Sequence, residues 1–245
     1  MPRKIHVIWI ICCAIILVGF IYFSMQLQMK EMETKRQEQI AQDQALAKRN
    51  KAKAAQVNKA GEIIRNIKEM NALGNHAQAA KLAELAIQDD LENASIYMWW
   101  GISLVKASQP GDAMGKFVLS ARLDPNDPQT YLYWGLTLAM EKNFEEAIEK
   151  YRISVELDPD NNNALGYWGA ALQQLGEYDQ AIEKLEKAMA INSFNGLIYG
   201  VLVDSWYHKG EYRKAWEVVF RARNVKITVA DKSLKRLAEA MPEPK

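Results

Sequence analysis

Apolar positions along the chain follow three different patterns. Residues 5–23 form an unbroken apolar run without Asp, Glu, Lys or Arg. Residues 24–59 are mostly polar, contain no Gly or Pro, and are rich in Gln, Lys, Glu, Ala and Met, which favour helix. From residue 60 onward, apolar and small residues recur at helical spacing, and the pattern repeats every 34 residues. The sequence therefore predicts an all-α chain with an apolar helix, a polar helix and a repeat region.

The apolar run is long enough to cross a membrane. A helix over residues 5–23 spans about 28 Å, close to the thickness of a bilayer core. A core helix of this length would normally show a polar face, and this run has only His6. The bulky Phe20 and Tyr22 stand where signal-peptide cleavage requires small residues. We predict an uncleaved transmembrane anchor over residues 1–23.

The polar segment after the run is predicted to be a single helical stalk over residues 24–59. Met25, Met29 and Met32 begin a heptad, but polar residues such as Arg36 and Asp43 then occupy the same seam, which disfavours a coiled coil. An unbroken helix of this length extends about 50 Å.

The repeat region divides into five units of 34 residues without a gap: 60–93, 94–127, 128–161, 162–195 and 196–229. Numbering the places from the first residue of each unit, place 20 is alanine in all five, and place 27 is alanine or serine. Place 8 is glycine in the three central units, within the triplets "WWG" at 99–101 and "YWG" at 133–135 and 167–169. Small residues at these places allow close helix packing.

The unit resembles the tetratricopeptide repeat (TPR), a helix–turn–helix of 34 residues with tryptophan, glycine, alanine and proline at set places. The resemblance is strongest in residues 130–159 and 164–191. It implies an α-solenoid of five units over residues 60–227, the last reaching 229 in strict register. The remaining residues, 228–245, are predicted to form a capping helix and a tail, with Val229, Leu234, Leu237 and Met241 on the apolar side of the helix. We expect Trp100, Trp134 and Trp168 to be largely buried between units, with the following glycine making room for each ring.

Composition and charge limit the classes of function that the sequence supports. Residues 1–59 carry ten basic and four acidic side chains, residues 60–195 carry 11 and 20, and residues 196–245 carry ten and six. A basic stalk next to a bilayer can contact anionic headgroups, although a solvated helix face explains it equally well. Both cysteines lie inside the apolar run, and the three histidines are far apart. No catalytic, phosphate-binding or metal-binding motif is present, so we predict a non-enzymatic protein without cofactor, metal or nucleic-acid partner.

The resemblance further implies that the first helix of each unit lines a concave groove. The residues carried over to this groove are Met98, Trp99, Ile102, Leu132, Tyr133, Leu136, Met140 and Tyr167. Family members that bind C-terminal carboxylates use Lys, Asn and Arg at groove places, and the equivalent residues here, such as Ile64, Met98 and Tyr133, do not match. An apolar peptide or an amphipathic helix fits such a surface better. The alternative is that part of this surface packs on the protein's own first unit or cap.

These features predict a membrane-anchored scaffold that docks a protein partner. The alternatives are a scaffold that binds a copy of itself, giving a homo-oligomer, and an assembly factor for a membrane complex. The short N-terminal tail with Arg3 and Lys4 favours a cytosolic N-terminus, which places the repeats in the periplasm at a bacterial inner membrane. The basic residues of the stalk favour the opposite orientation, with the repeats facing the cytoplasm.

Overall fold

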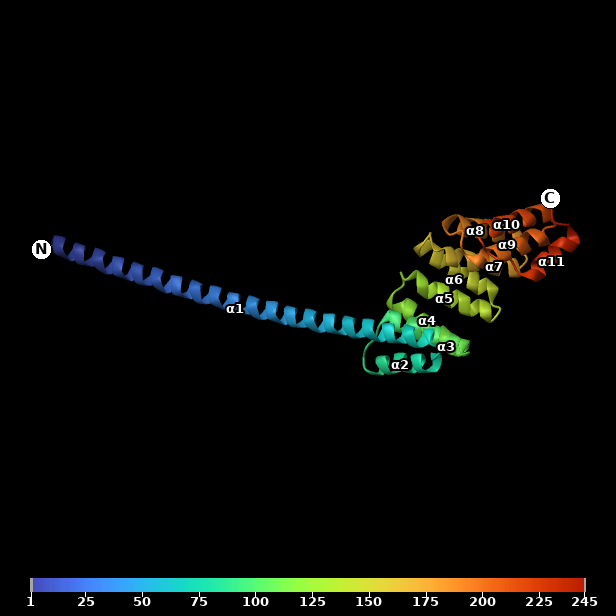
Figure 1. Ribbon diagram of the computed structural model, residues 1–245. Coiled ribbons are helices and arrows are strands. Elements are labelled where there is room, and N and C mark those ends of the chain that lie inside the picture. Colours follow the sequence, from blue (N-terminus) through green and yellow to red (C-terminus); the bar gives the residue numbers. More distant parts are fainter. Residues whose placement is uncertain (1, 245) are drawn as a thin grey trace. The chain divides into compact units, whose positions relative to one another are not determined.

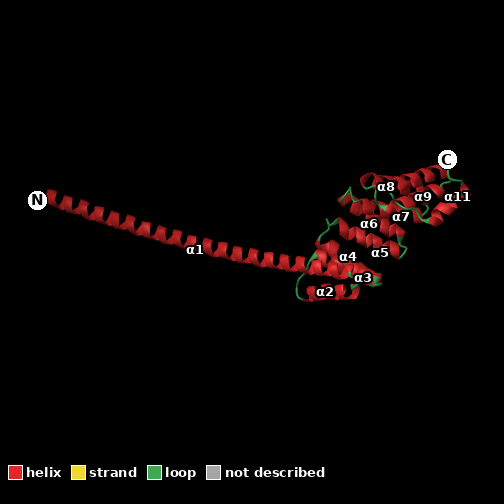
Figure 2. Cartoon of the chain, in the orientation of Figure 1, coloured by secondary structure: helices red, strands yellow, loops and turns green. Residues whose placement is uncertain are grey.

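The computed structural model describes residues 2–244, with side chains from residue 16 onward, and every regular element in that range is a helix (Figure 2). The chain forms two compact units, Met1–Lys59 and Ala60–Lys245. The helices are α1 (Pro2–Ala72), α2 (His76–Gln88), α3 (Ala94–Lys106), α4 (Pro110–Leu123), α5 (Pro128–Met140), α6 (Phe144–Leu157), α7 (Asn162–Gln174), α8 (Tyr178–Ile191), α9 (Gly196–His208), α10 (Tyr212–Asn224) and α11 (Asp231–Ala240).

In the first unit, residues 2–59 are helical and belong to α1. The side chains from residue 16 to 59 are exposed apart from Ser24, and pairs such as Glu31 and Lys35, 2.7 Å apart, support the helix locally. Among the residues described with side chains, no helix combines the length and apolarity needed to cross a membrane. Residues 5–15 of the predicted span lie outside that set.

The second unit is a solenoid of antiparallel helix pairs that stack in chain order (Figure 1). The first helices α3, α5, α7 and α9 each begin at the first place of their repeat. Each starts after an Asn or Asp whose side chain accepts a hydrogen bond from a backbone N–H in the first turn: Asn93, Asp127, Asn161 and Asn195. Such caps satisfy N–H groups that have no partner within the helix, so they fix the start of each unit.

The turn between the two helices of a unit has the same backbone conformation in all five repeats. Place 15 has a positive φ in every unit. The angles are 81° at Gly74, 63° at Ser108, 64° at Lys142, 80° at Gly176 and 76° at Gly210. Glycine takes this conformation without steric cost, whereas Ser108 and Lys142 adopt it at a cost. The turn geometry is therefore imposed by packing of the helices rather than by the residue present.

Inside each unit, place 8 of the first helix and place 24 of the second helix have complementary sizes. A Cβ atom added to Gly101, Gly135 or Gly169 would lie 2.8, 2.7 or 2.6 Å, respectively, from the side chain at place 24 of its unit. The five pairs are Ile67 with Ala83, Gly101 with Phe117, Gly135 with Tyr151, Gly169 with Leu185, and Val203 with Val219. All of these side chains are buried. A large residue on one helix thus faces a small one on the other, or two valines share the space.

This pairing corrects the expectation for the tryptophan–glycine triplet. The glycine makes room for the side chain at place 24, not for the tryptophan before it. The rings of Trp100, Trp134 and Trp168 are only partly buried. Each has the ammonium group of a lysine from its own second helix over the ring, at 3.7 Å for Lys116, 4.1 Å for Lys150 and 4.8 Å for Lys184. The tryptophans therefore form a row of cation–π pairs at the surface.

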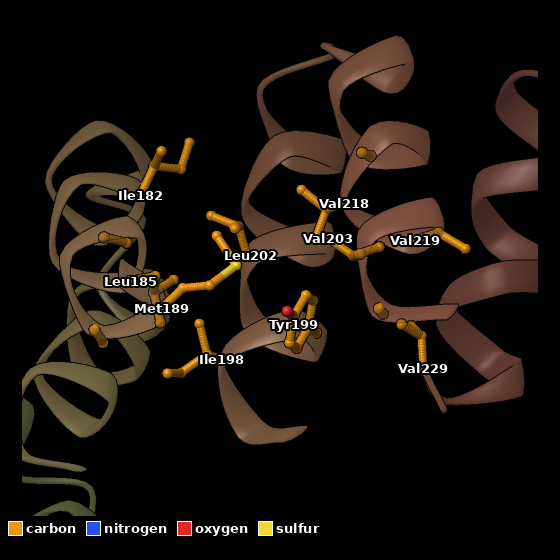
Figure 3. Packing of buried hydrophobic residues seen from close by; sticks show 14 of the residues in the cluster. Ile182, Leu185, Met189, Ile198, Tyr199, Leu202, Val203, Val218, Val219 and Val229 are labelled. Atoms are coloured by element: carbon orange, nitrogen blue, oxygen red, sulfur yellow. The ribbon is translucent and has the colours of Figure 1, made fainter. Parts of the chain in front are cut away.

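The core extends from unit to unit and is largest at the C-terminal end. Figure 3 shows Leu185 and Met189 of α8 packing towards Ile198 and Leu202 of α9, with side chains of α10 on the other side. Helix α11 covers the last pair through Leu237, which is fully buried. Leu234 packs on the same cluster, together with Val229 just before α11 and Met241 just after it. The helix is therefore shorter than the predicted set of residues, but all four of these residues face the core.

Candidate peptide-binding groove

A hollow of about 430 Å³ lies between the first helices of the second and third repeats. Residues of α3 and α5 form its walls, and Phe117 of α4 contributes to its lining. The lining residues are Ile102, Val105, Lys106, Ser108, Phe117, Tyr133, Leu136, Thr137 and Met140. Its volume is within the range of sites that hold a small ligand or a few side chains of a peptide.

The lining is mainly apolar, and its polar residues are Lys106, Ser108, Tyr133 and Thr137. The Thr137 hydroxyl donates to the backbone carbonyl of Tyr133 at 2.8 Å. Lys106 is the one charged lining residue, and it is exposed, so its ammonium group can remain in water. Met140, with 56% of its surface exposed, supplies a flexible apolar side chain at the edge. The hollow therefore favours an uncharged, apolar occupant.

Three tyrosines gather beside the hollow, at the second helix of the third repeat and the first helices of the third and fourth. The rings of Tyr151 and Tyr167 stack with centroids 6.1 Å apart. Burial raises the pKa of Tyr133, and nearby Tyr167 raises it further. The same two causes, burial first, raise the pKa of Tyr151 well above its usual range. Both phenols are thus neutral at physiological pH, which keeps this surface uncharged.

The corresponding surface of the fifth repeat is covered by the chain itself. Asp204 and Tyr207 occupy places 9 and 12, the places that Ile102 and Val105 hold in the second repeat. Arg236 of α11 forms an ion pair with Asp204, and its guanidinium carbon lies 4.4 Å from the centre of the Tyr207 ring. The Trp216 indole N–H also donates to the carbonyl of Met241 at 2.9 Å, which holds the end of the cap. The groove is therefore closed at its C-terminal end.

The structure brings together half of the residues predicted for the groove. Ile102, Tyr133, Leu136 and Met140 line the hollow. The other four do not line it: Met98 and Leu132 are buried in the core, Trp99 lies under the ammonium group of Lys68 at 4.9 Å, and Tyr167 stacks on Tyr151. The alternative expectation was that the chain itself covers part of the groove surface. This is the arrangement in the fifth repeat, where α11 packs on α9.

The sequence did not predict Lys106, Ser108, Phe117 and Thr137 of the lining, nor Tyr151 beside the hollow. Phe117 and Tyr151 share one feature. Both belong to second helices, whereas the predicted groove was confined to first helices. The signal that identifies them is the glycine sixteen residues earlier, because the missing side chain of Gly101 or Gly135 lets the ring of place 24 pass between the helices. A large residue at place 24 can thus reach the groove side of the unit.

Comparison with known proteins agrees with the repeat pattern. The family model of the tetratricopeptide repeat matches residues 128–161. Comparison with curated proteins gives no significant match. Among solved structures, PilF of Pseudomonas aeruginosa superposes with a TM-score of 0.67 at 20% identity, over 75% of this chain and 84% of that one. A crystal structure of MamA gives 0.60 at 20% identity, over 69% and 96%. These likenesses concern the fold.

Proposed function

Because this chain is built from tetratricopeptide repeats, we propose that it is a non-catalytic scaffold that docks a protein partner in the groove formed by its first helices. The observation that carries the proposal is the mainly apolar hollow between α3 and α5, whose one charged residue, Lys106, is exposed. Tetratricopeptide repeats generally form scaffolds for protein–protein interaction, and extended solenoid surfaces suit that role. The occupant is an apolar peptide or an amphipathic helix, since the lining offers no cluster of basic residues for a carboxylate.

We also propose that residues 5–23 anchor the chain in a membrane and that the stalk separates the repeats from it. The support is the absence of Asp, Glu, Lys and Arg over that run and the exposed, polar helix that follows. The orientation we propose places the repeats in the periplasm at a bacterial inner membrane. Protease treatment of intact cells tests it: the repeats should be protected until the outer membrane is opened, and cleavage only after the inner membrane is broken would place them in the cytoplasm.

Docking can be tested by site-specific photo-crosslinking in cells. A benzophenone amino acid at Met140, which is exposed at the edge of the hollow, should form an adduct with the partner. The same group at exposed Glu145 on α6 is the matched control and should give none. The adduct at Met140 should disappear when Tyr133 is changed to alanine, because this removes an aromatic anchor. Equal adducts at both positions would contradict docking in the groove, and an adduct of twice the chain's mass would indicate self-assembly.

A further inference from the structure

The side chain of Tyr151 differs from its equivalents in the neighbouring repeats by one polar atom. Phe117 and Leu185 hold the same place in the second and fourth repeats, and neither has a hydrogen-bonding group. The Tyr151 side chain is fully buried, and its hydroxyl has no hydrogen-bond partner within residues 16–244. A buried hydroxyl without a partner is unfavourable, and a phenyl ring would fill almost the same space. The fold alone therefore gives no reason for the hydroxyl.

The equivalence with Phe117 assigns the ring of Tyr151 to the groove side of the molecule. Phe117 packs against Gly101 and lines the hollow between α3 and α5. Tyr151 packs against Gly135 in the same way, so its ring lies one repeat further along, between α5 and α7. Its contact with Tyr167, which was predicted for the groove and is partly buried, agrees with that position.

We propose that the Tyr151 hydroxyl is the polar specificity determinant of the groove and hydrogen-bonds an uncharged polar side chain of the docked partner segment. This inference rests on the proposed docking function. The segment is mainly apolar, because it also fills the hollow between α3 and α5, and it carries one Ser, Thr, Asn or Gln at the place that meets Tyr151. It extends from α3 to α7, since α11 covers the surface of α9. Tyr167 turns aside on docking, a rotamer change of a kind common at interfaces.

An uncharged polar group is the best match for this hydroxyl. Tyr133, Tyr151 and Tyr167 lie near one another here and offer neutral hydrogen-bonding groups, which match an amide or a hydroxyl. A carboxylate or ammonium group would lose its hydration without gaining an opposite charge from them, and burying a charge is far more costly than burying an amide or hydroxyl. A wholly apolar segment would leave the hydroxyl unpaired. The groove therefore prefers one uncharged polar residue for two reasons. The new hydrogen bond favours this residue, and charged or apolar residues at the same position are disfavoured.

The experiment selects peptides from a displayed library of random short sequences on the immobilised full-length chain. Parallel selections use three variants: Tyr151→Phe, Tyr131→Phe and Leu136→Asp. Tyr131 is the matched control, because its ring stacks on Trp134 with centroids 6.5 Å apart, away from the hollow. We expect the unaltered chain and Tyr131→Phe to select apolar peptides with a Ser, Thr, Asn or Gln at one fixed position. Tyr151→Phe should select the apolar pattern without that polar residue, and Leu136→Asp should select neither.

The best peptide then gives the size of the effect. Its affinity, measured by fluorescence anisotropy, should fall roughly fivefold to tenfold with Tyr151→Phe and remain unchanged with Tyr131→Phe. The melting temperature of Tyr151→Phe should not fall, because an unpaired buried hydroxyl is removed. The same consensus from the unaltered chain and from Tyr151→Phe would overturn the inference and leave the docking function standing. A marked fall in melting temperature would assign the hydroxyl a structural role and also overturn it. If Leu136→Asp selects the same peptides as the unaltered chain, both proposals fail.

Discussion

The second and third repeats have an open groove, whereas the fifth repeat has the same backbone arrangement with its groove surface covered. In the open repeats, places 9 and 12 hold apolar residues such as Ile102 and Val105, which line a hollow. In the covered repeat the same places hold Asp204 and Tyr207, which bind Arg236 of α11. The two helices of each repeat pack in the same way, because every repeat buries one residue at place 8 against one residue at place 24.

The difference shows that the same arrangement of two helices can carry two kinds of groove surface. In the fifth repeat, places 9 and 12 of the first helix contact the chain's own cap, and under our proposal the same face of the open repeats contacts the docked segment. The cap also indicates what this surface can hold, since α11 is an amphipathic helix that lays one leucine, Leu237, into the core. In the second and third repeats, the place of Asp204 holds the apolar residues Ile102 and Leu136. An occupant of this surface would find no carboxylate there to pair with an arginine, which agrees with an apolar occupant.

The largest expected effect comes from uncovering the fifth repeat. Leu237→Ala should lower the free energy of unfolding by about 2–5 kcal/mol, because it removes a fully buried side chain and loosens α11. Leu136→Ala is the control in the open hollow, where the side chain is only partly buried, and it should cost markedly less. Urea unfolding of the full-length chain measures both. Equal losses would mean that the two surfaces are equally covered.

An intermediate effect is expected from exchanging the pair beneath the groove. Gly135→Val should destabilise by about 1–3 kcal/mol, because even a Cβ atom there would approach Tyr151 to 2.7 Å. Adding Tyr151→Val recreates the valine pair of the covered repeat, Val203 with Val219, and should recover a large part of that loss. A double-mutant cycle in urea measures the coupling between the two positions. Additive losses would show that the sizes at the two places are not matched to each other.

The smallest effect is expected at the turn of place 15. Lys142 of the open third repeat has a φ of 64°, and Gly210 of the covered repeat has 76°. Lys142→Gly should stabilise by up to about 1 kcal/mol, because a left-handed conformation is costly for lysine and free for glycine. The reciprocal change Gly210→Lys should destabilise by a similar amount. Thermal melting detects both shifts, and effects of the same sign would refute the conformational explanation.

The helices of the repeat region could be predicted from the sequence because their signals are local and occur five times. The 34-residue period predicted the starts of α3, α5, α7 and α9, and the amphipathic pattern indicated α11. Four residues of the hollow, Ile102, Tyr133, Leu136 and Met140, also followed from the family's groove places. Because each signal recurs at the same place of several repeats, even a weak signal could be recognised.

The remaining features depend on contacts between helices. Such contacts cannot be predicted from the residue at one place of the repeat. Gly135 follows Trp134 in the sequence, but it makes room for Tyr151, sixteen residues later. Met98 and Leu132 lie at groove places, yet both are buried and neither lines the hollow. Arg236 reaches Asp204 only because α11 folds back on α9. Size complementarity across helices could have been found by comparing places 8 and 24 through all five repeats.

The pairing of places 8 and 24 has a consequence for how such a chain can change in length. Both partners belong to the same 34-residue unit, so a unit that is duplicated or lost carries its own matched pair with it. The Asn or Asp that starts the next first helix is the last residue of the unit before it, and every junction has one. A gene duplication in steps of 34 codons could therefore lengthen the groove without creating a misfit, and natural selection could then adjust the two groove residues of the new copy on their own.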